Sequence, residues 1–281
     1  GTPVVTLADL ECTLSEDGSI VGRASYDLDG RPGDFLRLAI PEGAEILAAT
    51  ADGITAPPRR EGPGRIAIPL PEAAASRVVV AWTSGPPPPR GDGARRLRLP
   101  TLPGQDCLTL VTVAAPDSAT FAETGTAKAA APAELESARA AARARAILER
   151  VATFDRSSPR DRSALLAALV RFELQARAAE RAARGDMLTR GTAPGLALTS
   201  LREARASLSE ALTTSGLEEF ARSAAARVGR STSDPMDATA EPPEAAAPLR
   251  IRPLGRISAF RDATGRGGIA WDVAPRSTRI L

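Results

Sequence analysis

The chain has 281 residues, of which 43% are hydrophobic and only 3% aromatic, so it is long and apolar enough for one large domain or two ordinary ones. Its 36 basic residues nearly balance 34 acidic ones, and they are scattered along the chain without interleaved aromatics, which argues against a nucleic-acid-binding surface. Histidine is absent, which excludes histidine-dependent triads and histidine metal ligands. Because Walker-type loops and Gly-x-Ser-x-Gly elbows are also missing, we expect no catalytic residue and no cofactor.

Apolar and polar residues alternate in short runs through residues 4–116. Turn signals such as Glu16-Asp17-Gly18-Ser19 and Asp52-Gly53 separate these runs. A period of two places the apolar side chains on one face of each strand. We predict eight or nine short strands that fold as an antiparallel β-sandwich over residues 1–120. Four prolines at residues 86–89 predict a stiff connection of polyproline II type.

From residue 131 the apolar period becomes that of a helix. Pro132 suits the first turn of one helix, and Ser158 with Pro159 predicts the cap and first turn of a second, which we expect to end at Gly185. A third helix is predicted from about Thr199, with a shorter one after it, so residues 131–229 form a helical hairpin or bundle. The second helix carries an apolar seam, formed by Leu165, Leu169, Phe172, Ala176, Ala179 and Ala183.

The remaining residues change character twice. Residues 230–248 are rich in Ser, Pro, Ala and Glu, which is typical of a flexible linker. Residues 249–281 contain further strand-like runs, and this short β segment either rejoins the first sheet system or forms a separate terminal hairpin. The predicted fold class is therefore α+β: an antiparallel β-sandwich that a helical bundle follows or interrupts, with a short C-terminal β segment.

Four stretches carry a resemblance to a known class of protein: "LRLAIPEGAEILAATADGITAPP", "GRIAIPLP", "RVVVAWTS" and "LRLPTLPGQDCLTLVTVAAP". They resemble β-sandwich modules of large, poorly characterised, membrane-anchored envelope proteins of planctomycete-like bacteria. The resemblance covers residues 4–116 and, more weakly, 249–275. It implies a sandwich followed by a helical stretch, a short β segment and a membrane anchor, and it brings no catalytic residues.

The same resemblance and the start at Gly1 without methionine lead us to expect a processed piece of a longer protein. No stretch approaches the roughly 18 consecutive apolar residues of a membrane helix. We therefore expect an extracytoplasmic location, in the periplasm or cell envelope, with tethering to the membrane only through a segment absent from this chain.

Two sets of residues are candidate sites. Cys12 and Cys107 either form a disulfide in an oxidising compartment or remain two buried free thiols. Asp27, Asp29 and Asp34 surround a glycine-containing turn, as in calcium loops, but the closing glutamate of an EF-hand is missing. Asp and Gly are equally what an ordinary turn prefers.

These observations predict a non-enzymatic, extracytoplasmic structural or protein-interaction module. In this hypothesis the helical seam packs against a protein partner or a second copy of the chain. The alternative is a carbohydrate-binding module, although Trp82, Trp271 and Tyr26 are few and have the pattern of core residues. A carboxylate-based hydrolase is a third hypothesis.

Overall fold

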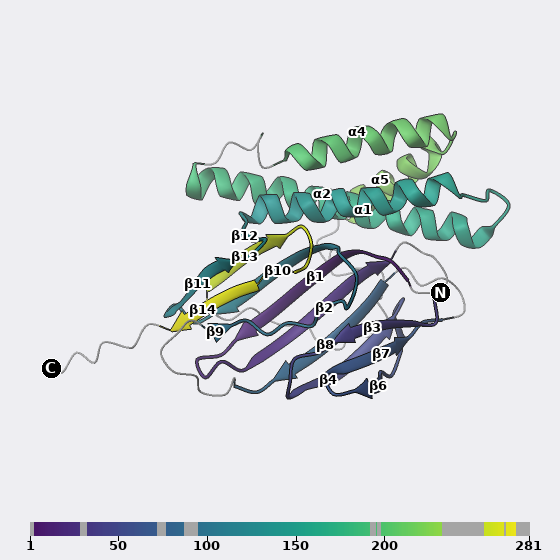
Figure 1. Ribbon diagram of the computed structural model, residues 1–281. Helices are drawn as coiled ribbons and strands as arrows, with labels where there is room; N and C mark the ends of the chain where they lie inside the picture. Colours follow the sequence, from purple (N-terminus) through teal and green to yellow (C-terminus); the bar gives the residue numbers. More distant parts are fainter. Residues whose placement is uncertain are drawn as a thin grey trace, which may run out of the picture. The chain divides into compact units, whose positions relative to one another are not determined.

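The computed structural model describes residues 3–28, 33–71, 77–86, 95–191, 195, 198–231, 256–266 and 268–273 (Figure 1). Residues 232–248 of the predicted linker, most of the proline-rich connection and Asp29 lie outside these residues, whereas the first two residues of the predicted linker end a helix that spans Glu218–Ser231. The fold class is α+β, as predicted, with strands on both sides of the helices in the chain. The chain divides into a β unit, Gly1–Ala129 with Ala245–Leu281, and a helical unit, Ala130–Glu244.

The strands of the β unit form three sheets in the described part of the chain. The largest has eight strands in the order β12-β13-β10-β1-β2-β8-β4-β5, and the others have the orders β11-β14-β9 and β3-β7-β6. The strand bounds are β1 Val5–Leu14, β2 Ile20–Leu28, β3 Phe35–Ala39, β4 Ala44–Ala51, β5 Ile54–Thr55, β6 Arg59–Gly62, β7 Arg65–Pro69, β8 Arg77–Ser84, β9 Arg95–Arg96, β10 Leu108–Ala115, β11 Ala119–Thr124, β12 Ala127–Ala129, β13 Arg256–Asp262 and β14 Gly268–Val273.

One strand pair departs from the antiparallel pattern. Strands β1 and β10 pair in parallel, with Leu7 opposite Leu108 and Cys12 opposite Val113. The alternation of apolar and polar residues indicates which face of a strand is buried. This alternation is the same whether the strand pairs in parallel or antiparallel. Strand β10 therefore joins the sheet on the side of β1 that β2 leaves open, which the sequence pattern does not reveal.

The two C-terminal strands occupy interior positions in two sheets. Strand β13 lies between β10 and β12, with Phe260 opposite both Val111 and Ala129. Strand β14 lies between β11 and β9, and Trp271 is opposite Phe121 and Arg95. Figure 1 shows both strands in yellow beside the teal strands that they pair with. The β unit is thus assembled from two segments that are far apart in the sequence.

A single apolar cluster connects the three sheets. It includes Tyr26 and Trp82 from the largest sheet, Leu38 and Ile68 from the β3-β7-β6 sheet, and Trp271 from the third. All five side chains are at most 2% exposed. The smaller sheets therefore pack on the largest one, and the three aromatic residues are core residues.

The packing around Trp82 depends on a glycine in the neighbouring strand. Gly22 on β2 is directly opposite Trp82 on β8, and a Cβ atom at Gly22 would lie 2.2 Å from the indole ring. Because the ring is fully buried, it has no room to move away from such an atom. A glycine is required at position 22 because any side chain there would collide with the Trp82 ring.

The helical unit contains α1 (Pro132–Ala152), α2 (Pro159–Arg190), α4 (Thr199–Thr214) and α5 (Glu218–Ser231). The predicted cap is confirmed, because Ser158 Oγ accepts a hydrogen bond from the Asp161 N–H at 3.2 Å. The prediction that α2 ends at Gly185 is wrong, since the helix continues to Arg190 and ends at Gly191, which has a φ of 67°. None of the helices in the described residues is long and apolar enough to span a membrane.

Helix α2 passes through Gly185 because the residues beside it are buried. A glycine inside a helix costs about 1 kcal/mol relative to alanine, which packing of the neighbouring turn offsets. Ala183 is 1% exposed and Asp186 is 5% exposed, so the helix is held on both sides of the glycine.

The predicted interaction seam is part of the core of the helical unit. Five of its six residues belong to one apolar cluster with Ala140, Ala144, Ile147 and Val151 of α1. The sixth, Ala183, packs against Ala133 of α1. Each of the six side chains is at most 2% exposed: Leu165, Leu169, Phe172, Ala176, Ala179 and Ala183. The prediction that the seam is a surface for a partner is wrong. Its small side chains instead allow α1 and α2 to pack closely.

Two helices are capped by side chains from a neighbouring helix. The carboxylate of Asp186 on α2 accepts a hydrogen bond from the Ala133 N–H in the first turn of α1 at 3.0 Å. The hydroxyl of Ser137 on α1 accepts one from the Leu201 N–H in the first turn of α4 at 3.0 Å. The side chains at the N-cap positions, Ala131 and Leu198, form no capping hydrogen bond. The caps therefore couple helix ends to tertiary packing.

We predict that Gly22→Ala destabilises the β unit by about 3 kcal/mol, because the added methyl group overpacks the core at Trp82. Both tryptophans of the chain, Trp82 and Trp271, lie in this unit, so tryptophan fluorescence during denaturation measures its unfolding. Gly85→Ala is the control, since a Cβ there meets no atom within 4 Å. Equal stability of the two variants would contradict the packing at Gly22.

We predict that Asp186→Ala lowers the stability of the helical unit by about 1–2 kcal/mol, because an N-terminal amide of α1 loses its acceptor. Circular dichroism at 222 nm during denaturation follows this unit. Glu210→Ala, an exposed acidic position on α4, should change stability by less than about 0.5 kcal/mol. Equal losses in both variants would show that Asp186 does not cap α1.

Candidate functional site

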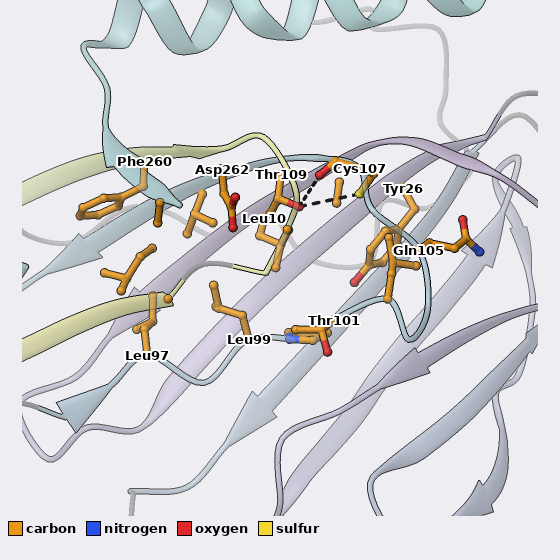
Figure 2. A pocket seen from close by; sticks show the side chains of 18 residues that line it. Leu10, Tyr26, Leu97, Leu99, Thr101, Gln105, Cys107, Thr109, Phe260 and Asp262 are labelled. Atoms are coloured by element: carbon orange, nitrogen blue, oxygen red, sulfur yellow. Dashed lines mark hydrogen bonds between the residues drawn. The ribbon is translucent and has the colours of Figure 1, made fainter. Parts of the chain in front are cut away.

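A cavity of about 110 Å³ lies in the β unit, and 18 residues line it. One wall comes from the largest sheet and includes Ala8, Leu10 and Phe260. The opposite wall comes from residues 97–107, here called the crossing segment, with Leu97 and Leu99 (Figure 2). Most of the lining is apolar, as in small-molecule sites generally.

The crossing segment is fixed at several points. The backbone of Thr101 exchanges two hydrogen bonds of 2.9 Å with Ala39 of β3. The Gln105 side chain accepts from the Val5 N–H and donates to the Pro3 carbonyl, each at 3.0 Å. Because these bonds hold the segment to two other parts of the β unit, the cavity has a defined wall rather than a loose loop.

Tyr26 supplies a buried hydroxyl at the cavity. The side chain comes from β2, is 0% exposed, and its hydroxyl points towards the middle of the lining side chains (Figure 2). No group among the described residues forms a hydrogen bond with this hydroxyl. Burial also raises the pKa of Tyr26 above its usual range, so the phenol is protonated and can donate. A buried polar group without a partner costs about 1–3 kcal/mol. Among the described residues, Thr13 Oγ1 and Trp82 Nε1 are also buried without a hydrogen bond, but neither residue lines the cavity, as Tyr26 does.

Other polar side chains at the cavity, those of Gln105, Thr109 and Asp262, are hydrogen-bonded within the protein. Thr109 Oγ1 donates to the Cys107 carbonyl at 3.4 Å and lies 3.8 Å from Cys107 Sγ. Burial raises the pKa of the Cys107 thiol, while hydrogen bonds from Thr109 and the Ala8 backbone act in the opposite direction. Cys107 is therefore a thiol and not an activated thiolate at neutral pH.

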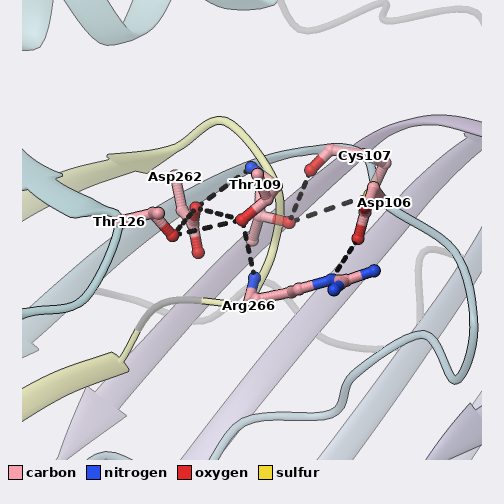
Figure 3. Close-up of polar contacts among 7 residues, drawn as sticks. Asp106, Cys107, Thr109, Thr126, Asp262 and Arg266 are labelled. Carbon is pink, nitrogen blue, oxygen red and sulfur yellow. Dashed lines mark hydrogen bonds and ion pairs between the residues drawn. The ribbon is translucent and has the colours of Figure 1, made fainter.

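Asp262 organises the turn between β13 and β14 beside the cavity (Figure 3). Its Oδ1 accepts hydrogen bonds from Thr126 Oγ1 at 2.7 Å, from the Thr264 N–H at 3.1 Å and from Thr264 Oγ1 at 3.2 Å. The Arg266 N–H donates to Thr264 Oγ1 at 3.3 Å, and Arg266 Nε pairs with Asp106 at 2.5 Å. This network holds the turn against β12 and the crossing segment.

Sequence reasoning did not identify this site. Tyr26 stands in an alternating strand, where the pattern predicts only a core residue. Asp262 and Thr264 form the side-chain-to-backbone turn that Asp-x-Thr sequences favour, so this part had a sequence signal. Tyr26 and Asp262 lie beside the crossing segment only because strands that are far apart in the sequence pair with each other.

The candidate disulfide is not formed, and both cysteines are buried free thiols. Cys12 pairs with Val113 across the parallel β1–β10 ladder, whereas Cys107 precedes Val113 by six residues. At about 3.3 Å per residue the two cysteines are offset by about 20 Å along the strands. A disulfide requires Cα atoms within about 7 Å, so the fold separates this pair.

The calcium-loop candidates do not form a cluster in the described residues. Asp27 on β2 pairs with Arg77 Nε at 3.6 Å, and Asp34 is exposed. Asp29 lies outside the described residues. Within the parts of the chain that the structure describes, no group of three or more His, Cys, Asp or Glu side chains could hold a metal ion.

No protein-family model and no curated protein matches the chain. Among solved structures, a mutant M1 zinc metallopeptidase from Deinococcus radiodurans is 19% identical over 45% of this chain and 35% of that chain, with a TM-score of 0.36. Leukotriene A4 hydrolase from Saccharomyces cerevisiae is 14% identical over 45% and 25%, with a TM-score of 0.34. An aminopeptidase N family protein from Idiomarina loihiensis is 12% identical over 44% and 25%, with a TM-score of 0.33. The chain thus spans about a third or less of the length of these structures.

The prediction of a non-enzymatic structural or protein-interaction module is not upheld. The helical seam on which it rests is internal core, and the proteins named above are a metallopeptidase, a hydrolase and an aminopeptidase family member. At these TM-scores the likeness itself assigns no activity, substrate or metal to this chain.

We predict that the free energy of unfolding of the β unit falls as the pH rises above 9, because burial raises the pKa of Cys12 from 9.0 to about 12. The unfolded chain then loses the proton first, and each such group lowers stability by up to about 1.4 kcal/mol per pH unit. Denaturation under reducing conditions between pH 8 and 11, followed by tryptophan fluorescence, measures this slope. Cys12→Ala should have the shallower slope, and identical slopes would place the Cys12 thiol in contact with water.

Proposed function

We propose that the β unit binds a small, largely apolar molecule in the cavity beside Tyr26. The observation that carries the proposal is the combination of an apolar cavity of about 110 Å³ with a buried tyrosine hydroxyl that no described residue pairs with. Empty space in a core costs stability, and an unpaired buried polar group adds a cost of its own. The first cost falls when a molecule of matching size fills the cavity, and the second falls when that molecule also accepts a hydrogen bond.

The cavity volume limits the size of the ligand. A cavity of about 150 Å³ lined by apolar side chains is known to bind benzene in another protein. The cavity of this chain is slightly smaller, at about 110 Å³. We therefore expect a molecule with about six non-hydrogen atoms.

The small size also limits the affinity. At about −0.7 kcal/mol for each non-hydrogen atom, six atoms give about −4 kcal/mol, which corresponds to a Kd of about 1 mM. Binding is therefore best measured by protein NMR at millimolar ligand, where chemical shifts of lining residues such as Ala8 and Ile269 report the site directly.

We predict that benzene, pyridine or 2-pentanone shifts the NMR signals of the lining residues in the full chain, with a saturating dependence on concentration. Leu99→Trp places a larger ring in the cavity and should abolish the shifts. Leu47→Trp is the matched control, because Leu47 is 49% exposed on β4 and does not line the cavity. This control should bind as the unaltered chain does.

A second variant at the same position tests the proposal even if Leu99→Trp does not fold. Leu99→Ala enlarges the cavity and should admit a bicyclic probe such as indole, which is too large for the unaltered chain. If none of the probes shifts the lining signals, or if Leu99→Trp binds as tightly as the unaltered chain, the proposed function is wrong.

A further inference from the structure

The cavity holds the means to choose between ligands of equal size. This inference rests on the proposed function and concerns the chemical class of its ligand. Of the polar groups at the cavity, Thr109 Oγ1 already donates to Cys107, and Gln105 already bonds to Val5 and Pro3. The Tyr26 hydroxyl has no such partner among the described residues.

We propose that Tyr26 is the specificity-determining residue of the cavity and selects small uncharged molecules that carry a hydrogen-bond acceptor. Its hydroxyl donates to a carbonyl, ether or ring-nitrogen atom of the ligand, while Leu10, Leu97 and Phe260 pack around the apolar part. A hydrocarbon of the same shape fills the cavity but leaves the hydroxyl unpaired. A site built to hydrogen-bond its ligand discriminates against the analogue that lacks the bonding atom.

The charges at the cavity disfavour anions. Among the described residues, the lining contains the Asp262 carboxylate and no lysine or arginine. A carboxylate ligand would lose its hydration, and no cation among the lining residues would replace it. It would also enter beside an acidic group that accepts three hydrogen bonds from Thr126 and Thr264 and holds the turn in place. The ligand class is therefore neutral.

Two isosteric probe pairs test this class in the full chain. Benzene and pyridine differ only in the ring nitrogen acceptor, and 2-pentanone and butyrate differ in a methyl group replaced by a charged oxygen. NMR titration gives a Kd for each. The ratio of the benzene Kd to the pyridine Kd should fall about five- to tenfold in Tyr26→Phe, since this variant keeps the shape and removes the donor. Butyrate should bind at least tenfold more weakly than 2-pentanone.

The control variant is Thr83→Val, which removes a hydroxyl that donates to the Ile20 carbonyl outside the cavity lining and should leave the benzene-to-pyridine ratio unchanged. Tyr26 is the single tyrosine of the chain, so ¹³Cζ-tyrosine labelling gives one signal. Pyridine should shift that signal more than benzene does, and this measurement needs no variant, so it decides the question even if Tyr26→Phe does not fold.

The failure of this inference is distinct from the failure of the proposed function. If none of the probes binds the unaltered chain, the proposed function is wrong and the inference falls with it. If benzene and pyridine bind but Tyr26→Phe leaves their ratio unchanged, the cavity binds ligands and Tyr26 does not select them. Equal affinity for butyrate and 2-pentanone would overturn the neutral class alone.

Discussion

The pairing of β13 and β14 with strands from the first part of the chain is the constraint on which the β unit depends. Strand β13 hydrogen-bonds to β10 and β12, and β14 to β11 and β9, so neither lies at an edge. Removing either strand would leave two neighbours with unpaired backbone groups. The same strands supply Phe260, Asp262 and Ile269 to the cavity. The site exists only when the distant segments are joined.

Local sequence predicted the elements better than their arrangement. The alternation of Leu10, Cys12 and Leu14 placed a strand correctly, and Ser158 with Pro159 located the start of α2. These signals are local because side-chain periodicity and capping involve neighbouring residues. The parallel β1–β10 ladder and the position of β13 involve pairing between distant residues, and no local pattern encodes it. The continuation of α2 through Gly185 likewise follows from packing with α1.

The site residues divide in the same way. Asp262 and Thr264 carry a turn signal that can be recognised in the sequence, although not its closeness to Thr126. Tyr26 carries no signal at all, since a tyrosine on the buried face of a strand is ordinary. Only the folded structure reveals that its hydroxyl has no hydrogen-bond partner among the described residues. The candidate residues that the sequence indicates have structural roles instead. Cys12 and Cys107 are buried thiols that lie far apart, and the α2 seam is part of the core.

Hydrogen exchange of the full chain tests the joined β unit most directly. If β13 and β14 are integral to it, their paired amide protons should exchange as slowly as those of β1 and β2, through the same global opening. The comparison of β13 with β10 is the most informative, because seven residue pairs connect them from Thr109 with Asp262 to Ala115 with Arg256. Fast exchange in β13 and β14, with β1, β2 and β8 still protected, would contradict the account.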